Sequence, residues 1–185
     1  MSHLFGNVVQ QGYVVPDVDA AMAHWIARGI GPFYIADIEG MDGEYYGDPI
    51  KSKMRAAFAY SGDQQIEVIQ PTGTNANIYA DYLKHHPDGG LQHLAVWVDN
   101  VDDAFAKLNA DGEKWRIAQR YGEAHIYADN IDQPGVMMQM MARSDFYDAF
   151  FGIVKRGADT WDGRTTPFRV IDFSSGAPVE KPYGT

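Results

Sequence analysis

The chain has 185 residues, enough for one compact domain or two small fused modules. Its formal net charge of −10, with no Lys/Arg stripe, argues against a nucleic-acid partner, and the lack of cysteine excludes disulfides, thiolate catalysis, zinc fingers and Fe–S clusters. Residues 1–11 carry no secretory leader pattern, and no apolar run approaches the roughly 18 residues that span a bilayer, so the sequence predicts a cytoplasmic protein without membrane contact.

An internal repeat organises the chain. Residues 13–23 resemble residues 96–106, which follow 83 positions later, and each copy reads as a short apolar strand, a capping residue and an amphipathic helix. Asp17 and Asn100 are the predicted N-caps, because their side-chain oxygens can accept hydrogen bonds from the first free helix N–H groups. The repeat predicts two copies of one structural module.

Three strand-like runs follow each predicted helix, separated by turn signals. They are residues 33–38, 53–60 and 65–70 in the first half, and residues 114–120, 124–129 and 136–142 in the second. Each half therefore reads βαβββ. We predict an α+β fold in which two such modules form a cupped mixed β-sheet with flanking helices.

The remaining segments complete the predicted organisation. The first module spans residues 1–72, a helical linker 73–90, the second module 91–143, and a C-terminal helix with an irregular tail 144–185. In the linker, residues 75–86 favour a short helix. In the C-terminal part, residues 145–155 favour an amphipathic helix, whereas residues 157–185, rich in Gly, Pro and Thr, are expected to be irregular. Residues 39–50 are expected to form a loop, either a lid or an ordered surface loop.

Four polar side chains interrupt apolar strands. Gln10 and His93 occupy the same place in the repeat, seven residues before the helix caps, while Glu67 and Gln139 each lie inside an apolar run. A buried charge is costly unless it is paired or binds a metal. If both halves curl the same way, these groups meet in a shared cup as a mixed nitrogen and oxygen site. Such a site suits one divalent ion, with Zn, Ni, Co, Mn and Fe(II) all open.

The same segments carry a family resemblance. Residues 10–17, 66–71, 93–100 and 132–139 together resemble the glyoxalase/bleomycin-resistance/extradiol-dioxygenase (vicinal-oxygen-chelate) superfamily, over about residues 7–142. The resemblance implies two βαβββ modules around a cup. Its metal ligands, carried over position by position, fall on Gln10, Glu67, His93 and Gln139. Glyoxalase-like members often carry Glu at the fourth position, so Gln139 is a departure that leaves Glu67 as the only carboxylate base.

Other residues are candidates for substrate contact. His125, mid-strand, is a candidate second acid/base group or substrate contact, and Tyr60, Trp97 and Tyr127 are candidate pocket walls, although histidines and aromatic residues at such strand positions are more often packed core residues. The four predicted ligands have alternatives too: a hydrogen-bonded histidine, a solvent-facing glutamate, and amides paired in a metal-free cup.

Three functions remain open at this stage. The first is a metal-dependent lyase or isomerase acting on a small oxo-compound, with Glu67 and His93 as catalytic residues. The second is a metal-free small-molecule binding protein similar to the bleomycin-resistance branch. The third is a metal-free enzyme that moves protons with His93, Glu67 or His125. A homodimer is expected in each case.

Overall fold

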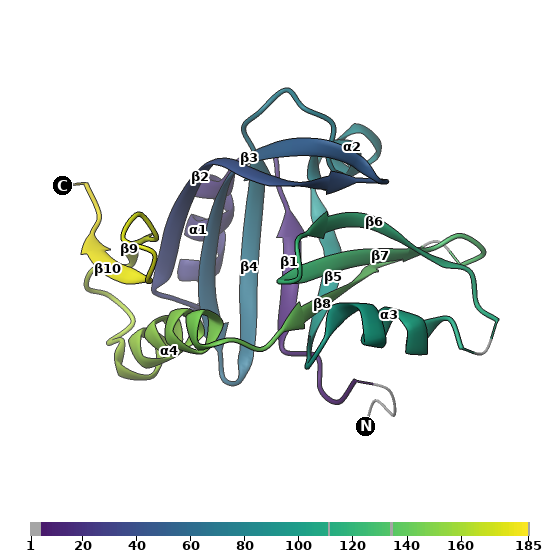
Figure 1. Cartoon of the computed structure of the whole chain (residues 1–185). Coiled ribbons are helices and arrows are strands. Elements are labelled where there is room, and N and C mark those ends of the chain that lie inside the picture. The colour runs from purple at the N-terminus through teal and green to yellow at the C-terminus, as the bar shows by residue number, and fades with distance from the viewer. Residues whose placement is uncertain (1–4, 111, 134, 185) are drawn as a thin grey trace.

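The structure is a computed structural model that describes residues 5–110, 112–133 and 135–184, and Figure 1 shows its arrangement. The described residues form fourteen elements in this order: β1 Gln10–Val14, α1 Val18–Ile26, β2 Phe33–Tyr45, β3 Asp48–Ser61, β4 Gln64–Pro71, α2 Ile78–His85, β5 Gly90–Val98, α3 Val101–Leu108, β6 Trp115–Tyr121, β7 His125–Asn130, β8 Met137–Ala142, α4 Asp145–Thr160, β9 Phe168–Asp172 and β10 Val179–Pro182.

The predicted repeat is confirmed by this order, because β1-α1-β2-β3-β4 and β5-α3-β6-β7-β8 are two βαβββ modules. Both predicted caps are formed. The Asp17 carboxylate accepts the Ala20 N–H at 2.9 Å, and the Asn100 amide oxygen accepts the N–H groups of Asp102 and Asp103 at 2.9 and 3.0 Å. Each cap satisfies helix N–H groups that have no partner inside the helix.

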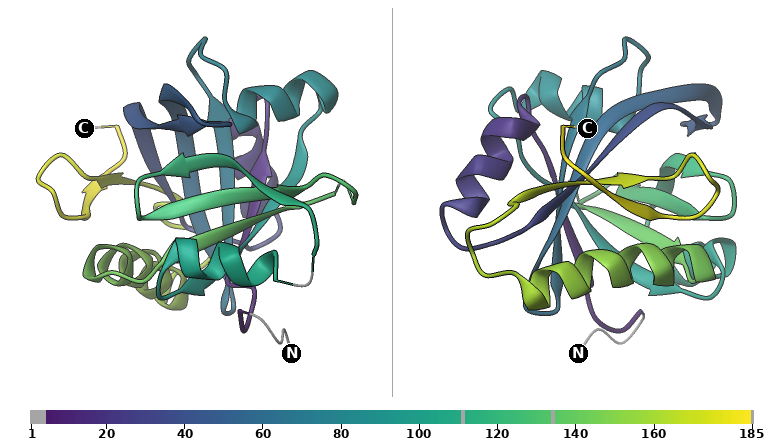
Figure 2. Two further views of the ribbon diagram at one scale, coloured as in Figure 1. Left: turned by 45° about the vertical axis from the view of Figure 1, so that its right-hand side comes forward. Right: turned by 90° about the vertical axis from the view of Figure 1, so that its left-hand side faces the viewer.

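One mixed sheet joins the two modules, in the order β10-β9-β2-β3-β4-β1-β5-β8-β7-β6. The modules meet where β1 and β5 pair antiparallel. The far end of β2 also pairs with β6, through Glu44 opposite Arg120 and Tyr45 opposite Gln119. This pairing closes the eight strands of the two modules into a barrel, so the predicted cup is closed within a single chain (Figures 1 and 2).

The loop prediction for residues 39–50 is wrong, because these residues are the distal half of the long β2–β3 hairpin. A two-residue turn at Tyr46 and Gly47, both with positive φ, connects Tyr45 to Asp48, which are paired across the hairpin. The register shifts between Ile38 and Met41, so a bulge bends β2 there. Gly40 and Gly43 lie within β2, and Gly47 belongs to the turn.

The irregular tail predicted for residues 157–185 is also wrong. Helix α4 continues to Thr160, β9 pairs parallel with β2, and β10 pairs antiparallel with β9. Gly157 lies inside the helix and is buried where α4 approaches β2. A Cβ at this position would lie 2.1 Å from the Tyr34 hydroxyl oxygen, so the close approach requires glycine. The right-hand view of Figure 2 shows the β9–β10 hairpin running alongside α4.

The core is divided by the barrel wall. Helices α1 and α3 pack on its outer surface in two separate apolar clusters, one around Val18 and Met22 and the other around Val101 and Leu108. A third and larger cluster fills the interior and includes residues of α2 and α4. Among the described residues no helix is long and apolar enough to cross a membrane.

Candidate active site

Two rows of paired residues cross the middle of the barrel. In the first row, Gln10 on β1 lies opposite Gln65 on β4 and Ala95 on β5, and Ala95 in turn lies opposite Gln139 on β8. Alternate residues of a strand share a face, so these side chains all point to one side of the sheet. The small Ala95 between the two amides leaves space above it. The Gln10 amide nitrogen donates to the Gln65 amide oxygen at 2.6 Å.

The second row places Gly12 between Glu67 on β4 and His93 on β5. The imidazole of His93 occupies the space that a side chain at position 12 would take, because a Cβ on Gly12 would lie 1.9 Å from His93 Cε1 and 2.1 Å from Nε2. His93 Nδ1 lies 2.7 Å from the amide oxygen of Gln92, whose amide nitrogen faces the Met137 sulfur at 3.4 Å. Because the Gln92 amide oxygen is an acceptor, this pairing assigns a proton to Nδ1, and Nε2 is the ring atom that faces Glu67.

Four atoms of the predicted ligand set lie buried without a hydrogen-bond partner. They are Oε1 of Gln10, Oε2 of Glu67, Nε2 of His93 and Oε1 of Gln139. His93 Nε2 and Glu67 Oε2 lie 3.3 Å apart. Buried polar atoms are normally satisfied, so unpaired acceptors gathered on two neighbouring rows indicate a missing partner that is a donor or a cation.

A divalent ion fits this donor set, since three oxygens and one imidazole nitrogen are ligands that such ions accept. In the part of the chain that the structure describes, no three His, Asp or Glu side chains form a metal cluster. An ion held here would therefore depend on the amide oxygens of Gln10 and Gln139, with Glu67 as its only anionic ligand.

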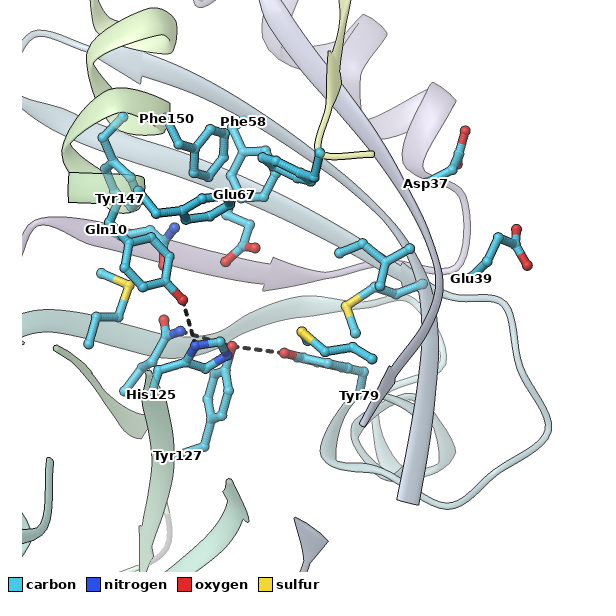
Figure 3. Close-up of a pocket in the computed structure, with 18 of the residues that line it drawn as sticks. Gln10, Asp37, Glu39, Phe58, Glu67, Tyr79, His125, Tyr127, Tyr147 and Phe150 are labelled. Carbon is cyan, nitrogen blue, oxygen red and sulfur yellow. Dashed lines mark hydrogen bonds between the residues drawn. The ribbon is translucent and has the colours of Figure 1, made fainter. Parts of the chain in front are cut away.

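A pocket of about 630 Å³ opens above these rows. Gln10, Glu67 and Gln139 form its floor, while His93 is fully buried behind the floor and does not line it. Figure 3 shows the side chains of Gln10, Glu67, His125 and other residues facing this common space. The structure thus brings together the four predicted ligands, with three exposed to the pocket and His93 directly beneath.

Several tyrosine hydroxyls lie close enough to the Glu67 carboxylate to be affected by its negative charge. The hydroxyl of Tyr127 accepts hydrogen bonds from the Tyr79 hydroxyl at 2.8 Å and from the Gln139 amide nitrogen at 2.9 Å. Burial, and next the negative charge of Glu67, raise the pKa of Tyr127 well above its ordinary value. Burial likewise raises the pKa of Tyr121, to about 12, and Glu67 adds to that shift. These phenols therefore stay protonated and can donate hydrogen bonds.

His125, a predicted substrate contact, lines the pocket beside Tyr127. Its Nδ1 lies 2.7 Å from the hydroxyl of Tyr147, which comes from α4. Burial, with a smaller contribution from His93, lowers the pKa of His125 to about 4. His125 is consequently neutral at pH 7, and it connects the C-terminal helix to the floor of the pocket.

Two predicted substrate contacts lie elsewhere. Tyr60 is beside Lys155, whose ammonium lies 6.0 Å from the ring centroid, and Trp97 packs against Tyr147 and Phe151; neither lines the pocket. Trp97 stands behind the pocket wall, in contact with residues that do line it.

Several residues of this site were not predicted from the sequence. Gly12 could have been noticed as an isolated glycine inside an apolar strand, which often marks close approach of another group. Tyr79 and Tyr147 gave no comparable signal, because an amphipathic helix does not reveal which surface it covers. Gln92 points inward through a register irregularity of β1 and β5 that no sequence pattern predicts.

Comparison with known proteins agrees with this architecture. The profile of the Glyoxalase/Bleomycin resistance protein/Dioxygenase superfamily matches residues 9–130, and the chain belongs to this superfamily. The matched range ends before β8, α4 and the β9–β10 hairpin.

Individual relatives are more distant. The mitochondrial methylmalonyl-CoA epimerase of Bos taurus is 25% identical over 144 residues, which are 73% of this chain and 73% of the relative. The solved methylmalonyl-CoA epimerase of Mycobacterium tuberculosis superposes with a TM-score of 0.53 at 19% identity, covering 80% of this chain and 95% of that one. A hypothetical protein of Bacillus halodurans gives a TM-score of 0.54 at 12% identity, covering 75% and 95%. The two structures establish a shared fold alone.

Proposed function

We propose that the chain is an isomerase-type enzyme that moves a proton at a carbon next to a carbonyl group, with Glu67 as the base. The observation that carries this proposal is the placement of Glu67. Among the described residues it is the only charged side chain on the pocket floor, its Oε2 has no hydrogen-bond partner, and its negative charge acts on the buried hydroxyl of Tyr127, which stays protonated. A carboxylate that is not tied up in an ion pair with Lys or Arg is free to accept a proton. The methylmalonyl-CoA epimerase named among the relatives is an isomerase, which supports the same type of reaction.

The proton balance is simple. The carboxylate of Glu67 takes a proton from the carbon beside the carbonyl, the electrons of that C–H bond form a C=C bond, and the carbonyl π electrons move to oxygen as an enolate. Return of the proton from Glu67 to a conjugated carbon on the same face gives the isomer without any co-reactant. The hydroxyls of Tyr127 and Tyr147 face the pocket and are the donors that can stabilise the enolate oxygen.

A divalent ion is part of this proposal. Gln10, Glu67, His93 and Gln139 would hold it, and when bound it would polarise the substrate carbonyl as a Lewis acid. Gln92 orients the His93 ring so that Nε2 faces the site, and partners of this kind commonly change metal affinity by about 10- to 100-fold when removed.

Solvent exchange tests the role of Glu67. Acetophenone and propionyl-CoA are incubated with the protein in D₂O, and loss of the protons beside the carbonyl is followed by proton NMR. Wild type should exchange at least one of them, and Glu67→Gln should slow that exchange by about 10²-fold or more, the usual contribution of a general base. The matched control Glu123→Gln removes an exposed carboxylate and should keep the wild-type rate. Equal rates in Glu67→Gln and wild type would remove Glu67 from the mechanism.

A titration tests the metal. Chelator-treated protein titrated with Zn²⁺ in a calorimeter should bind about one ion per chain, and His93→Gln should weaken that binding. The metal-free alternative is favoured by the single carboxylate in the donor set, because few anionic ligands bind a cation weakly. Exchange that continues unchanged in excess chelator would select the metal-free enzyme. Ligand binding without any exchange would select the binding protein.

A further inference from the structure

The C-terminal extension supplies one whole wall of the pocket. Phe146, Tyr147, Phe150 and Phe151 come from α4 and Phe173 follows β9, and all five line the pocket. They come from a part of the chain that lies beyond the range matched by the superfamily profile. The wall therefore comes from the segment that follows the two βαβββ modules and not from the modules themselves.

The wall is aromatic and continuous. Phe150 lies edge-to-face against Phe58 of the barrel at 4.8 Å between ring centroids, and against Phe173 at 5.3 Å. Phe146 and Phe173 are 5.4 Å apart, and Phe150 and Phe151 5.3 Å apart. Figure 3 shows Phe58 and Phe150 next to each other above Glu67 in that view. Rings held edge-to-face by one another present a fixed apolar surface that another flat ring system can pack against.

The rest of the apolar lining is adaptable. Met41 and Met54 come from β2 and β3, Met141 comes from β8, and Ile38 lies at the bulge of β2. Unbranched thioether side chains adjust to irregular shapes and make favourable contacts with aromatic rings. A rigid aromatic face combined with flexible methionines suits a flat, bulky ligand of variable outline.

The charges of the lining residues also favour an uncharged ligand. Among the residues that the structure describes, no Lys or Arg lines the pocket. Besides Glu67, the charged lining residues are Asp37 and Glu39. Their carboxylates lie on the far side of β2 from the floor (Figure 3) and pair with Arg55 and Lys53. An anionic group carried into the aromatic part of the pocket would lose its hydration without gaining a cationic partner.

We infer that the substrate is a neutral, ring-bearing apolar ketone. The inference rests on the proposed function in placing the oxo group at the floor beside Glu67, and it assigns the remainder of the molecule to the aromatic wall. A pocket of about 630 Å³ is within the range that encloses a ligand with several rings. The aromatic wall disfavours a small acidic acyl group, the kind of substrate that the relatives' name implies for them.

Three probes test this inference. 2-Acetylnaphthalene is a neutral ring-bearing ketone, 6-acetyl-2-naphthoate adds a carboxylate at the far end of the same rings, and propionyl-CoA carries a small acyl group. Binding is measured by calorimetry and by quenching of tryptophan fluorescence. Trp97 fluorescence is suited to detect a ligand at the aromatic wall, because its ring centroid lies 4.9 Å from that of Phe151 and 5.8 Å from that of Tyr147. The neutral ketone should bind more tightly than either of the others by about ten-fold or more.

Matched variants locate the effect. Phe173→Ala should weaken binding of 2-acetylnaphthalene by about ten-fold, because it removes one ring of the wall. Phe168→Ala truncates an equally half-buried aromatic residue of the same extension that contacts Tyr183 and does not line the pocket, so its affinity should match wild type. Equal effects of the two variants, or tighter binding of the naphthoate or of propionyl-CoA, would overturn the inference.

The same samples separate this inference from the proposed function. Exchange of the acetyl methyl protons of 2-acetylnaphthalene in D₂O reports the reaction, while calorimetry reports the pocket. Tight ketone binding without exchange keeps the substrate class and removes the isomerase proposal. If the protein exchanges the acyl protons of propionyl-CoA but does not bind the ketone, the isomerase proposal stands and the inferred substrate class is wrong.

Discussion

At the scale of single residues, the absence of a side chain at position 12 matters as much as the presence of His93. The imidazole lies where a Cβ on Gly12 would be, and it is fully buried, so it has little room to move away. The position of the His93 ring beneath the pocket floor therefore depends on the space that Gly12 leaves free.

Gly12→Ala should destabilise the fold by about 1–3 kcal/mol, the usual cost of adding atoms to a packed interior. It should also weaken Zn²⁺ binding, because the His93 ring must shift. Urea unfolding and calorimetric titration measure the two effects. The control is Gly135→Ala, where an added Cβ meets nothing within 4 Å and neither property should change. Unaltered stability and zinc affinity in Gly12→Ala would show that the ring has another place to go.

His125 predicts how stability depends on pH. Its pKa is lowered to about 4 in the folded protein from an ordinary value of 6.5, mainly by burial. Between these two values the unfolded chain binds a proton that the native chain does not, so stability rises with pH in this window. The contribution is fully present above pH 6.5, falls as the pH falls, and is at most about 3 kcal/mol.

The measurement is urea unfolding of chelator-treated protein from pH 7 to pH 4. His125→Gln should flatten the loss of stability below pH 6.5, whereas His24→Gln, which removes an exposed histidine, should leave it in place. A His125→Gln protein that loses as much stability as wild type over this range would show that His125 titrates normally when folded.

At the scale of elements, helix α4 contains two glycines with opposite expected behaviour. Gly157 is buried, and a Cβ would lie 2.1 Å from the Tyr34 hydroxyl oxygen, whereas at Gly152 the nearest atom is the mobile end of Arg156 at 3.0 Å. Glycine within a helix costs about 1 kcal/mol relative to alanine. Gly152→Ala should therefore stabilise the protein by up to about 1 kcal/mol, and Gly157→Ala should destabilise it by about 1–3 kcal/mol through the clash with β2.

Thermal unfolding compares the two variants directly, because both change the same residue type in the same helix. A stabilising Gly157→Ala would mean that α4 can move away from β2, and the pocket wall formed by α4 would then not be rigid.

The elements also show what the sequence could and could not predict. The repeat, both N-caps and the alternation of the strands were predictable from the sequence, because they are local patterns. Asp17 and Asn100 are residues that favour helix N-caps, and strands show a two-residue period. The distal half of the β2–β3 hairpin and the β9–β10 hairpin were missed, because their glycines resemble loop residues. The end of β2 and strand β9 also gain partners that are distant in the sequence, β6 and β2 respectively.

The candidate site was likewise predictable from the sequence only in part. Polar residues inside apolar runs identified Gln10, Glu67, His93 and Gln139 as candidates, but only the strand register shows that Gln10 and Gln139 flank Ala95. The aromatic wall was not predicted, because the apolar face of α4 has many possible surfaces to cover.

At the scale of the whole molecule, closure of the barrel bears on oligomeric state. Strands β2 and β6 pair within one chain, so the barrel around the pocket is closed without a second copy. The exposed edge strand, β10, has four residues, among them Glu180, Lys181 and Pro182, a composition that discourages pairing with another sheet. The predicted homodimer is untested, and the closed barrel predicts that ligand binding does not depend on it.

The last prediction follows from this closure. Binding of 2-acetylnaphthalene or Zn²⁺ per chain should stay constant across a dilution series that dissociates any dimer, because dissociation removes no lining residue. Native mass spectrometry reports the oligomer and the ligand stoichiometry at each concentration, and analytical ultracentrifugation checks the assembly in solution. A Glu180→Gln variant is a suitable control for the edge strand, since it removes a charge that is remote from the pocket floor. Ligand that is lost in step with dissociation would show that a second copy completes the site, and the closed barrel would then be insufficient for binding.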